Sequence, residues 1–160
     1  MQQLRLPAFF SAIVALGSVA LVSPSHASAQ SAVSPNGATY LTTVTDSTGA
    51  FYTRTVLTLH ADHTMSVVAA DQGGPTYFFS SQLGSWQPDG KGGVVGKTID
   101  FDYPPNADVA RIDYTISFNS ALGQATGTET LTTFPLQSDP FGSGGTSLGT
   151  YAFTSELVKP

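Results

Sequence analysis

Residues 110–118 read Ala-Arg-Ile-Asp-Tyr-Thr-Ile-Ser-Phe, and this stretch decides the fold because apolar and polar side chains alternate along it. Successive side chains of an extended strand point to opposite faces, so Ile112, Tyr114, Ile116 and Phe118 share one face. The polar residues between them share the other. A period of two indicates a strand with one buried face and one solvated face.

Comparable runs rich in Thr, Val, Ile, Tyr and Phe recur along the chain, separated by Gly, Asp, Asn and Pro. This is the pattern of strands and turns. In Pro88-Asp89-Gly90, for example, proline presets one backbone dihedral angle and glycine accepts the next. The eight predicted strands are Ala38–Thr45, Ala50–His60, Met65–Ala70, Thr76–Trp86, Gly93–Tyr103, Ala110–Phe118, Ala125–Phe134 and Gly149–Lys159.

The short connections favour antiparallel pairing of consecutive strands, because parallel crossovers need long connections or helices. An open meander would leave two exposed edges, and closure removes them. We therefore predict an all-β fold, an antiparallel meander of about eight strands closed into a barrel. A β-sandwich is the alternative, because the number of strands does not separate the two architectures.

Alternation also assigns faces to the predicted strand at 93–103. Its apolar members are expected to point into the barrel: Ile99, Phe101 and Tyr103. Its acidic members are expected to point outward: Asp100 and Asp102.

The N-terminal residues have the order of a secretory signal. Arg5 precedes an apolar stretch over 6–22, and Ala27-Ser28-Ala29 offers the small residues that a signal peptidase recognises. A membrane anchor is the competing interpretation, but the apolar stretch is short and no basic cluster follows it. We predict a signal peptide over 1–29, a flexible lead-in over 30–36 and one barrel domain over 37–160, with a secreted or periplasmic location.

Composition narrows the classes of partner. The chain has 6 Lys and Arg residues, 11 Asp and Glu residues and no cysteine. A mildly acidic chain without a basic stripe cannot neutralise phosphates, which argues against nucleic acid and anionic membrane surfaces. Without disulfides, the hydrophobic core must stabilise the fold alone.

His60-Ala61-Asp62-His63 is the densest polar cluster. Imidazole nitrogen and carboxylate oxygen suit zinc or a similar ion. The favoured interpretation is instead a hairpin turn that Asp62 begins, with His63 in a position where Gly or Asn is usual. No second ligand cluster accompanies it, so no metal site is predicted. The sequence also lacks a nucleophile elbow and a phosphate-binding loop, and no cofactor is predicted.

Two acidic features suggest acid–base chemistry. If the connection at 104–109 pairs Tyr103 with Ala110, Asp100 lies opposite Asp113, and contact between like charges raises one pKa. The pair is expected on the polar, solvated face, where water screens it. Glu129 is expected at the surface for the same reason.

Aromatic residues occur in nearly every predicted strand, and an eight-stranded barrel is either filled by its side chains or holds one small ligand. In the hollow case, the expected contacts of a small apolar ligand are Trp86, Phe101, Tyr103 and Tyr114. Two alternatives remain open. One is a cyclase or isomerase that uses His60 or Asp113 inside the cup, and the other is a structural surface protein with a filled barrel.

A resemblance to small secreted bacterial proteins of the lipocalin-like (calycin) type rests on three stretches: Val56–Thr64, Gly84-Ser85-Trp86 and Ile99–Tyr103. The second has the residue types of the lipocalin G-x-W pattern. The resemblance implies a barrel that binds a small apolar molecule in its cup. Barrels of the allene-oxide-cyclase-like and dirigent-like types share the gross architecture and would imply that a reactive ligand is guided through cyclisation or coupling.

Overall fold

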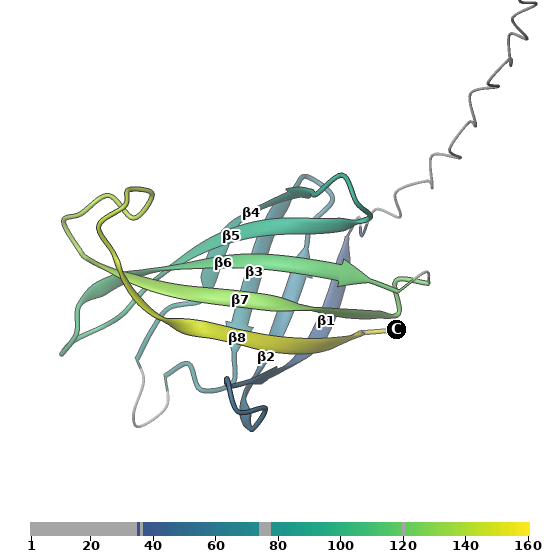
Figure 1. Ribbon diagram of the computed structural model, residues 1–160, viewed down its shortest axis with the longest axis horizontal. Helices are drawn as coiled ribbons and strands as arrows, with labels where there is room; N and C mark the ends of the chain where they lie inside the picture. The colour runs from purple at the N-terminus through teal and green to yellow at the C-terminus, as the bar shows by residue number, and fades with distance from the viewer. Residues whose placement is uncertain (1–34, 36, 74–77, 120) are drawn as a thin grey trace, which may run out of the picture.

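The computed structural model describes residue 35 and residues 37–73, 78–119 and 121–160. These residues form eight antiparallel strands that close into one barrel (Figure 1). The strands are β1 (Ala38–Thr45), β2 (Phe51–Leu59), β3 (Thr64–Ala69), β4 (Gln82–Pro88), β5 (Gly93–Phe101), β6 (Asp108–Phe118), β7 (Gln124–Pro135) and β8 (Thr146–Leu157). The predicted all-β barrel is confirmed. The sandwich is excluded, because β1 pairs with β8 as well as with β2.

The predicted strand boundaries differ most at β4, which begins at Gln82. The first two residues of the predicted strand, 76 and 77, lie outside the described residues. The segment before β4 touches the end of β5 instead. Phe79 forms an isolated bridge with Asp102, and the Ser80 amide donates a hydrogen bond to the Phe101 carbonyl over 3.0 Å.

The predicted signal peptide lies outside the described residues, as does the predicted lead-in except Pro35. The strands of the barrel run from Ala38 to Leu157, within the predicted domain. Among the residues that the structure describes, no helix is long and apolar enough to cross a membrane.

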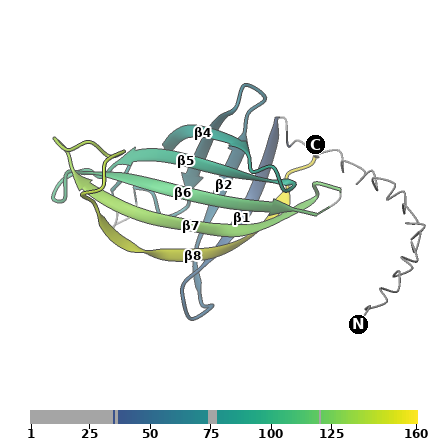
Figure 2. The same cartoon turned by 45° about the horizontal axis from the view of Figure 1, so that its top comes forward.

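The two ends of the barrel differ in their connections (Figures 1 and 2). One end carries the turns at 60–63, 89–92 and 119–123, and β1 begins and β8 ends there. The opposite end carries the connections at 46–50, 70–81, 102–107 and 136–145. We call these the short-turn end and the long-loop end.

The hydrophobic core fills the barrel towards the short-turn end. Inward side chains from all eight strands meet there, and they are almost completely buried: Tyr40, Leu57, Leu59, Met65, Val67, Trp86, Val94, Tyr114, Ile116, Ala125 and Phe153. The Trp86 indole NH donates to the His60 carbonyl oxygen over 3.1 Å, and the Tyr40 hydroxyl donates to the Leu122 carbonyl oxygen over 3.2 Å. These bonds tie the core to two of the turns that close this end.

The predicted faces of β6 are confirmed, but those of β5 are reversed. Ile112 and Ile116 are buried as expected. On β5, however, Asp100 is buried, whereas Phe101 and Tyr103 are each 51 % exposed. Ile99 and Asp102 share the reversal, because they alternate with these residues.

Strand register explains the reversal. Inward Val94, Gly96 and Asp100 pair with Ile116, Tyr114 and Ala110, respectively. The inward position of Gly96 requires glycine, because a Cβ atom there would lie 2.7 Å from the Met65 sulfur. The apolar residues Ile99 and Phe101 near the end of β5 suggested that the odd-numbered residues face inward. The adjacent Val94 and Val95 do not decide between the two assignments, because one of them faces inward in either case.

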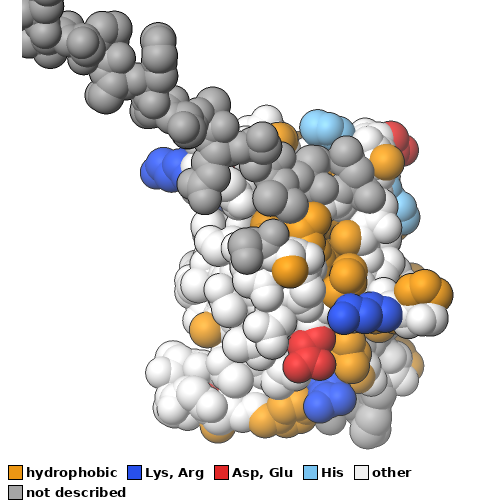
Figure 3. Space-filling model, turned by 90° about the vertical axis from the view of Figure 1, so that its right-hand side faces the viewer, with side chains coloured by type: hydrophobic (Ala, Val, Ile, Leu, Met, Phe, Trp, Pro, Cys, Tyr) orange, Lys and Arg blue, Asp and Glu red, His pale blue; other side chains and the backbone are white. Residues whose placement is uncertain are grey.

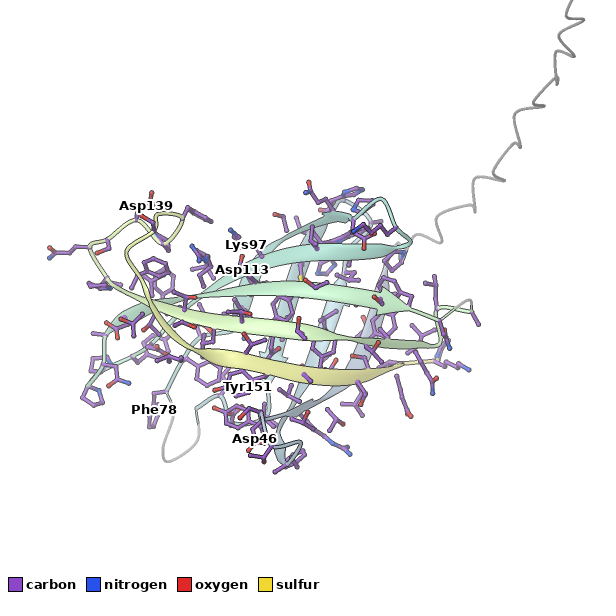
Figure 4. All side chains as sticks on the ribbon, in the orientation of Figure 1. Asp46, Phe78, Lys97, Asp113, Asp139 and Tyr151 are labelled. Atoms are coloured by element: carbon purple, nitrogen blue, oxygen red, sulfur yellow. The ribbon has the colours of Figure 1, made fainter. Side chains whose placement is uncertain are left out.

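The expected opposition of Asp100 and Asp113 is therefore wrong. Asp113 pairs with Lys97 across β5 and β6, and Asp100 pairs with Ala110. On the outer face, the Lys97 Nζ atom lies 3.2 Å from Asp113 Oδ1, and the Arg111 Nε atom lies 2.9 Å from Asp113 Oδ2. Figure 4 shows Lys97 and Asp113 side by side.

Candidate ligand-binding site

A cavity of about 290 Å³ lies inside the barrel towards the long-loop end. Side chains of β2, β5, β6, β7 and β8 form its walls, together with Ala69 at the end of β3 and Gln82 at the start of β4. Residues of the 70–81 and 102–107 connections contribute to its rim. Its lining includes Tyr52, Thr53, Thr55, Ala69, Asp71, Phe79, Gln82, Asp100, Asp102, Asn106, Ala110, Ile112, Glu129, Leu131, Thr133, Leu148 and Tyr151. The walls thus combine apolar side chains with an unusual number of carboxyl groups.

Asp100 is the most enclosed of these carboxyl groups. Its exposed fraction is 4 %, and its Oδ1 atom is buried without a hydrogen-bond partner. Burial, together with the nearby charge of Asp102, raises the pKa of Asp100 to about 7. An unpaired buried carboxylate is costly, because the protein returns none of the hydrogen bonds that water made with it.

Glu129 brings a second carboxyl group to the cavity from β7, and its expected surface position is wrong. It lies between two tyrosines, since Tyr114 is its partner on β6 and Tyr151 its partner on β8. Burial raises the pKa of Glu129 to about 7, a hydrogen-bonding interaction with Tyr114 opposes that rise, and the charge of Asp71 adds to it. Two carboxyl groups of this one cavity therefore titrate near neutral pH.

Gln82 joins the cavity to the packed core. Its Oε1 atom accepts a hydrogen bond from the Tyr114 hydroxyl over 2.6 Å and another from the Thr98 hydroxyl over 3.0 Å. Burial raises the pKa of Tyr114 well above its ordinary value, so the phenol stays protonated and donates. These bonds fix the orientation of the glutamine side chain at the inner limit of the cavity.

Aromatic rings lie at the outer limit of the cavity. The rings of Tyr52 and Tyr151 stack with their centroids 4.9 Å apart. Tyr151 is labelled in Figure 4, as is Phe78, which extends from the 70–81 connection at the same end. Between this pair and Gln82, the aliphatic walls come from Ile112 and Leu131.

The structure separates the four residues predicted as ligand contacts. Trp86 is buried in the packed core at the short-turn end, and Phe101 and Tyr103 lie on the outer surface. Tyr114 points inward and reaches the cavity through its bond to Gln82. Their contact with a ligand stays a prediction, but the residues around the cavity are mostly others.

The histidine cluster lies on the outside of the barrel, and it forms the predicted turn. Asp62 Oδ1 accepts hydrogen bonds from the Thr64 amide over 3.0 Å and from the Thr64 hydroxyl over 2.6 Å. His63 has a positive φ of 67°, the conformation that Gly or Asn usually supplies. Its ring stacks on Trp86 with 4.5 Å between centroids. Figure 3 shows histidine side chains at the molecular surface.

Among the described residues, no group of three His, Asp or Glu side chains is arranged to hold a metal ion. A second depression lies on the outer face of β4, β5 and β6, where outward Ser85, Lys97 and Asp113 are among its lining residues. In this depression Lys97 already neutralises the carboxylate of Asp113. The interior cavity is therefore the stronger candidate site.

Comparison of the chain with protein-family models, with curated proteins and with solved structures finds no match. The assignment of a function therefore depends on the geometry of the cavity.

Proposed function

We propose that this chain binds a small molecule inside the barrel, with the largely apolar part of the ligand against the walls of the cavity. The observation that carries the proposal is the cavity of about 290 Å³ inside the barrel at the long-loop end. Small-molecule sites are typically concave, mainly apolar and equipped with a few convergent polar groups. We further propose that the chain acts outside the cytoplasm, as the N-terminal sequence predicts.

The contrast within the barrel supports a binding role over a purely structural one. Tyr40 and Trp86 fill one end, where exposed fractions fall to 1 % and 3 %. Towards the other end the inward positions include the short side chains of Ala69, Ala110 and Thr55, which leave space. A barrel selected only for stability would gain from larger side chains at these positions, because interiors are normally close-packed.

Titration with prodan, a neutral naphthalene dye whose emission shifts to the blue in apolar surroundings, tests this function. We expect saturable binding with one dye per chain. Ala110→Leu should weaken binding at least about tenfold, because the added methyl groups would occupy the cavity. Ala152→Leu, the same change at an exposed position of β8, is the matched control.

Thermal unfolding of both variants shows whether each remains folded. Equal dye binding by the wild-type chain and folded Ala110→Leu would contradict an interior site. Should Ala110→Leu not fold, Ala69→Val offers a smaller change on another strand of the same cavity.

A second candidate function is proton-transfer catalysis, as in a cyclase or isomerase. The version that uses His60 or Asp113 inside the cup is wrong, since His60 is exposed and Asp113 lies on the outer face. The pKa values of Asp100 and Glu129, both about 7, favour a mechanism that uses these groups. A general acid or base is most effective when its pKa lies near the ambient pH. Mass spectrometry of a ligand before and after incubation separates the two functions, since a binder returns it unchanged.

A further inference from the structure

We infer that the cavity selects an organic cation, a small molecule in which an ammonium group is attached to an apolar body, and that Asp100 and Glu129 receive the ammonium group. This inference rests on the proposed binding function and names the chemical class of its ligand. Geometry, charge and unsatisfied hydrogen bonding each support it.

The first step is the charge of the cavity. Its described lining residues include four carboxyl side chains and no Lys, Arg or His: Asp71, Asp100, Asp102 and Glu129. Arg111 lies on a wall strand but points outward. Its Nη1 atom donates to the Pro140 carbonyl oxygen over 2.8 Å, and its guanidinium lies 5.1 Å from the centre of the Phe134 ring. Arg111 is therefore already bound by the 136–145 connection, and Arg54, the other cation that lies directly between two lining residues in sequence, is exposed on the outer face of β2.

The second step is the unsatisfied oxygen of Asp100. A side chain with only 4 % exposure would ordinarily have every polar atom paired, yet Oδ1 has no partner. Gln82 pairs with Tyr114 and Thr98, and Asp71 accepts a hydrogen bond from the Thr53 hydroxyl over 2.8 Å. Gln82 and Asp71 are thus engaged, whereas Asp100 Oδ1 has no donor. An ammonium group carries three donors and no acceptor, so it complements a carboxylate of this kind.

The third step is the aromatic setting of Glu129. Tyr114 and Tyr151 occupy the positions directly opposite it on the two adjacent strands. The face of an aromatic ring attracts a cation, and the attraction strengthens where water is excluded. Tyr52, stacked on Tyr151, extends the aromatic surface towards the mouth. An apolar body is accommodated against these rings and against Leu131.

An organic cation fits these observations better than a metal ion. No group of three potential ligands is arranged for a metal among the described residues. The walls also contain Ile112, Leu131 and aromatic rings, which suit a hydrocarbon body and offer a metal ion nothing.

Isothermal titration of the full chain at pH 8 with three probes of similar shape tests the inference. The probes are 2-phenylethylamine, the neutral 2-phenylethanol and the anionic 3-phenylpropanoate. We expect the amine to bind at least about tenfold more tightly than the alcohol, because hydrogen bonds to charged groups are stronger than those between neutral groups. The propanoate should bind most weakly, since the carboxylates of the cavity repel it.

Two substitutions locate the cation. Asp100→Asn and Glu129→Gln keep the side-chain shape and remove the charge, and each should reduce amine affinity at least about tenfold. Affinity for the alcohol should stay within about twofold. Asp113→Asn, on the outer face of β6, is the matched control and should leave all three affinities unchanged. Either interior variant suffices if the other does not fold.

The possible failures are distinguishable. If the alcohol binds as tightly as the amine, or if both interior variants keep the preference for the amine, the inference is overturned and the proposed function stands. If none of the three probes binds and prodan does not bind, the proposed function fails and the inference fails with it.

Discussion

The two ends of the barrel interior are made from the same eight strands but differ in the side chains that point inward. At the short-turn end, large apolar side chains such as Tyr40, Leu59 and Trp86 exclude water. Towards the long-loop end, the same alternation brings Asp100 and Glu129 inside, beside small residues such as Ala110. Inward position therefore does not imply apolar character. The first region stabilises the closed sheet, and the second retains unfavourable groups that stability alone does not require.

The comparison predicts that the greatest loss of stability follows from truncation in the packed region. Trp86→Ala should lower the free energy of unfolding by about 3–5 kcal/mol, because it leaves a void and removes the hydrogen bond to the His60 carbonyl oxygen. Phe101→Ala, the truncation of an aromatic residue that is 51 % exposed, should cost less than about 1 kcal/mol. Urea unfolding measures both, and equal losses would contradict the reversed faces of β5.

The next effect is the dependence of stability on pH, which reports on the acidic region. The folded-state pKa values of Asp100 and Glu129, about 7, exceed the ordinary values of 3.8 and 4.5. Between about pH 4 and pH 7 the folded chain therefore binds more protons than the unfolded chain, and stability falls as the pH rises through this window. We expect a loss on the order of 2–4 kcal/mol between pH 4.5 and pH 8.5, after allowance for water that enters the cavity.

Asp100→Asn should flatten this pH profile and raise the stability at pH 8.5, because it removes a buried charge that has no partner on Oδ1. A profile of the wild-type chain that is level between pH 4.5 and pH 8.5 would show that the two carboxyl groups are solvated. The cation site proposed above would then lose its main support.

The same two regions explain what the sequence could predict. Alternation in residues 110–118 identified β6 and its inner face, and turn residues between similar runs indicated the closed meander, which the structure confirms. The cavity was not predicted, because the face assignments took polar residues to point outward and the polar residues of the cavity point inward. In Ile99-Asp100-Phe101 an apolar–acidic–apolar pattern indicates an inward Phe101, and only the register with β6 reverses it.

Glu129 escaped prediction for a related reason. It lies in the threonine-rich sequence of β7, where little distinguishes the two faces, and its inward position follows from its pairing with Tyr114. Gly96 and Gly127 indicate which faces of β5 and β7 point inward. A Cβ atom at Gly96 would lie 2.7 Å from the Met65 sulfur, and one at Gly127 would lie 2.5 Å from the Phe153 ring. The two glycines therefore show which residues of β5 and β7 face inward. The sequence alone does not reveal this, because the side chains that they contact across the interior are not known from it.

A smaller effect is expected where the two regions meet. Tyr114→Phe should lower the free energy of unfolding by about 1 kcal/mol, because the Gln82 Oε1 atom loses one of its two hydrogen-bond donors and keeps Thr98. The lost interaction with Tyr114 should also raise the pKa of Glu129 further. Denaturant unfolding and NMR titration of the Glu129 carboxyl carbon measure the two effects. An unchanged Glu129 titration would show that the tyrosine does not stabilise the charged carboxylate.

The smallest effect is expected outside the barrel, for Asp113→Asn. This substitution removes the ion pairs with Lys97 and Arg111. The Lys97 and Asp113 side chains are 43 % and 38 % exposed, and exposed pairs contribute roughly 0–1 kcal/mol. Arg111, which is 17 % exposed, keeps its hydrogen bond to the Pro140 carbonyl oxygen. Unfolding at pH 8.5 should show a small loss, whereas Asp100→Asn should show a gain. The same change in chemistry on adjacent strands thus has opposite signs, because one aspartate has its cations beside it and the other faces a cavity without any among the described lining residues. A loss for both variants would mean that Asp100 is stabilised where it stands, and that the chain needs no ligand to complete it.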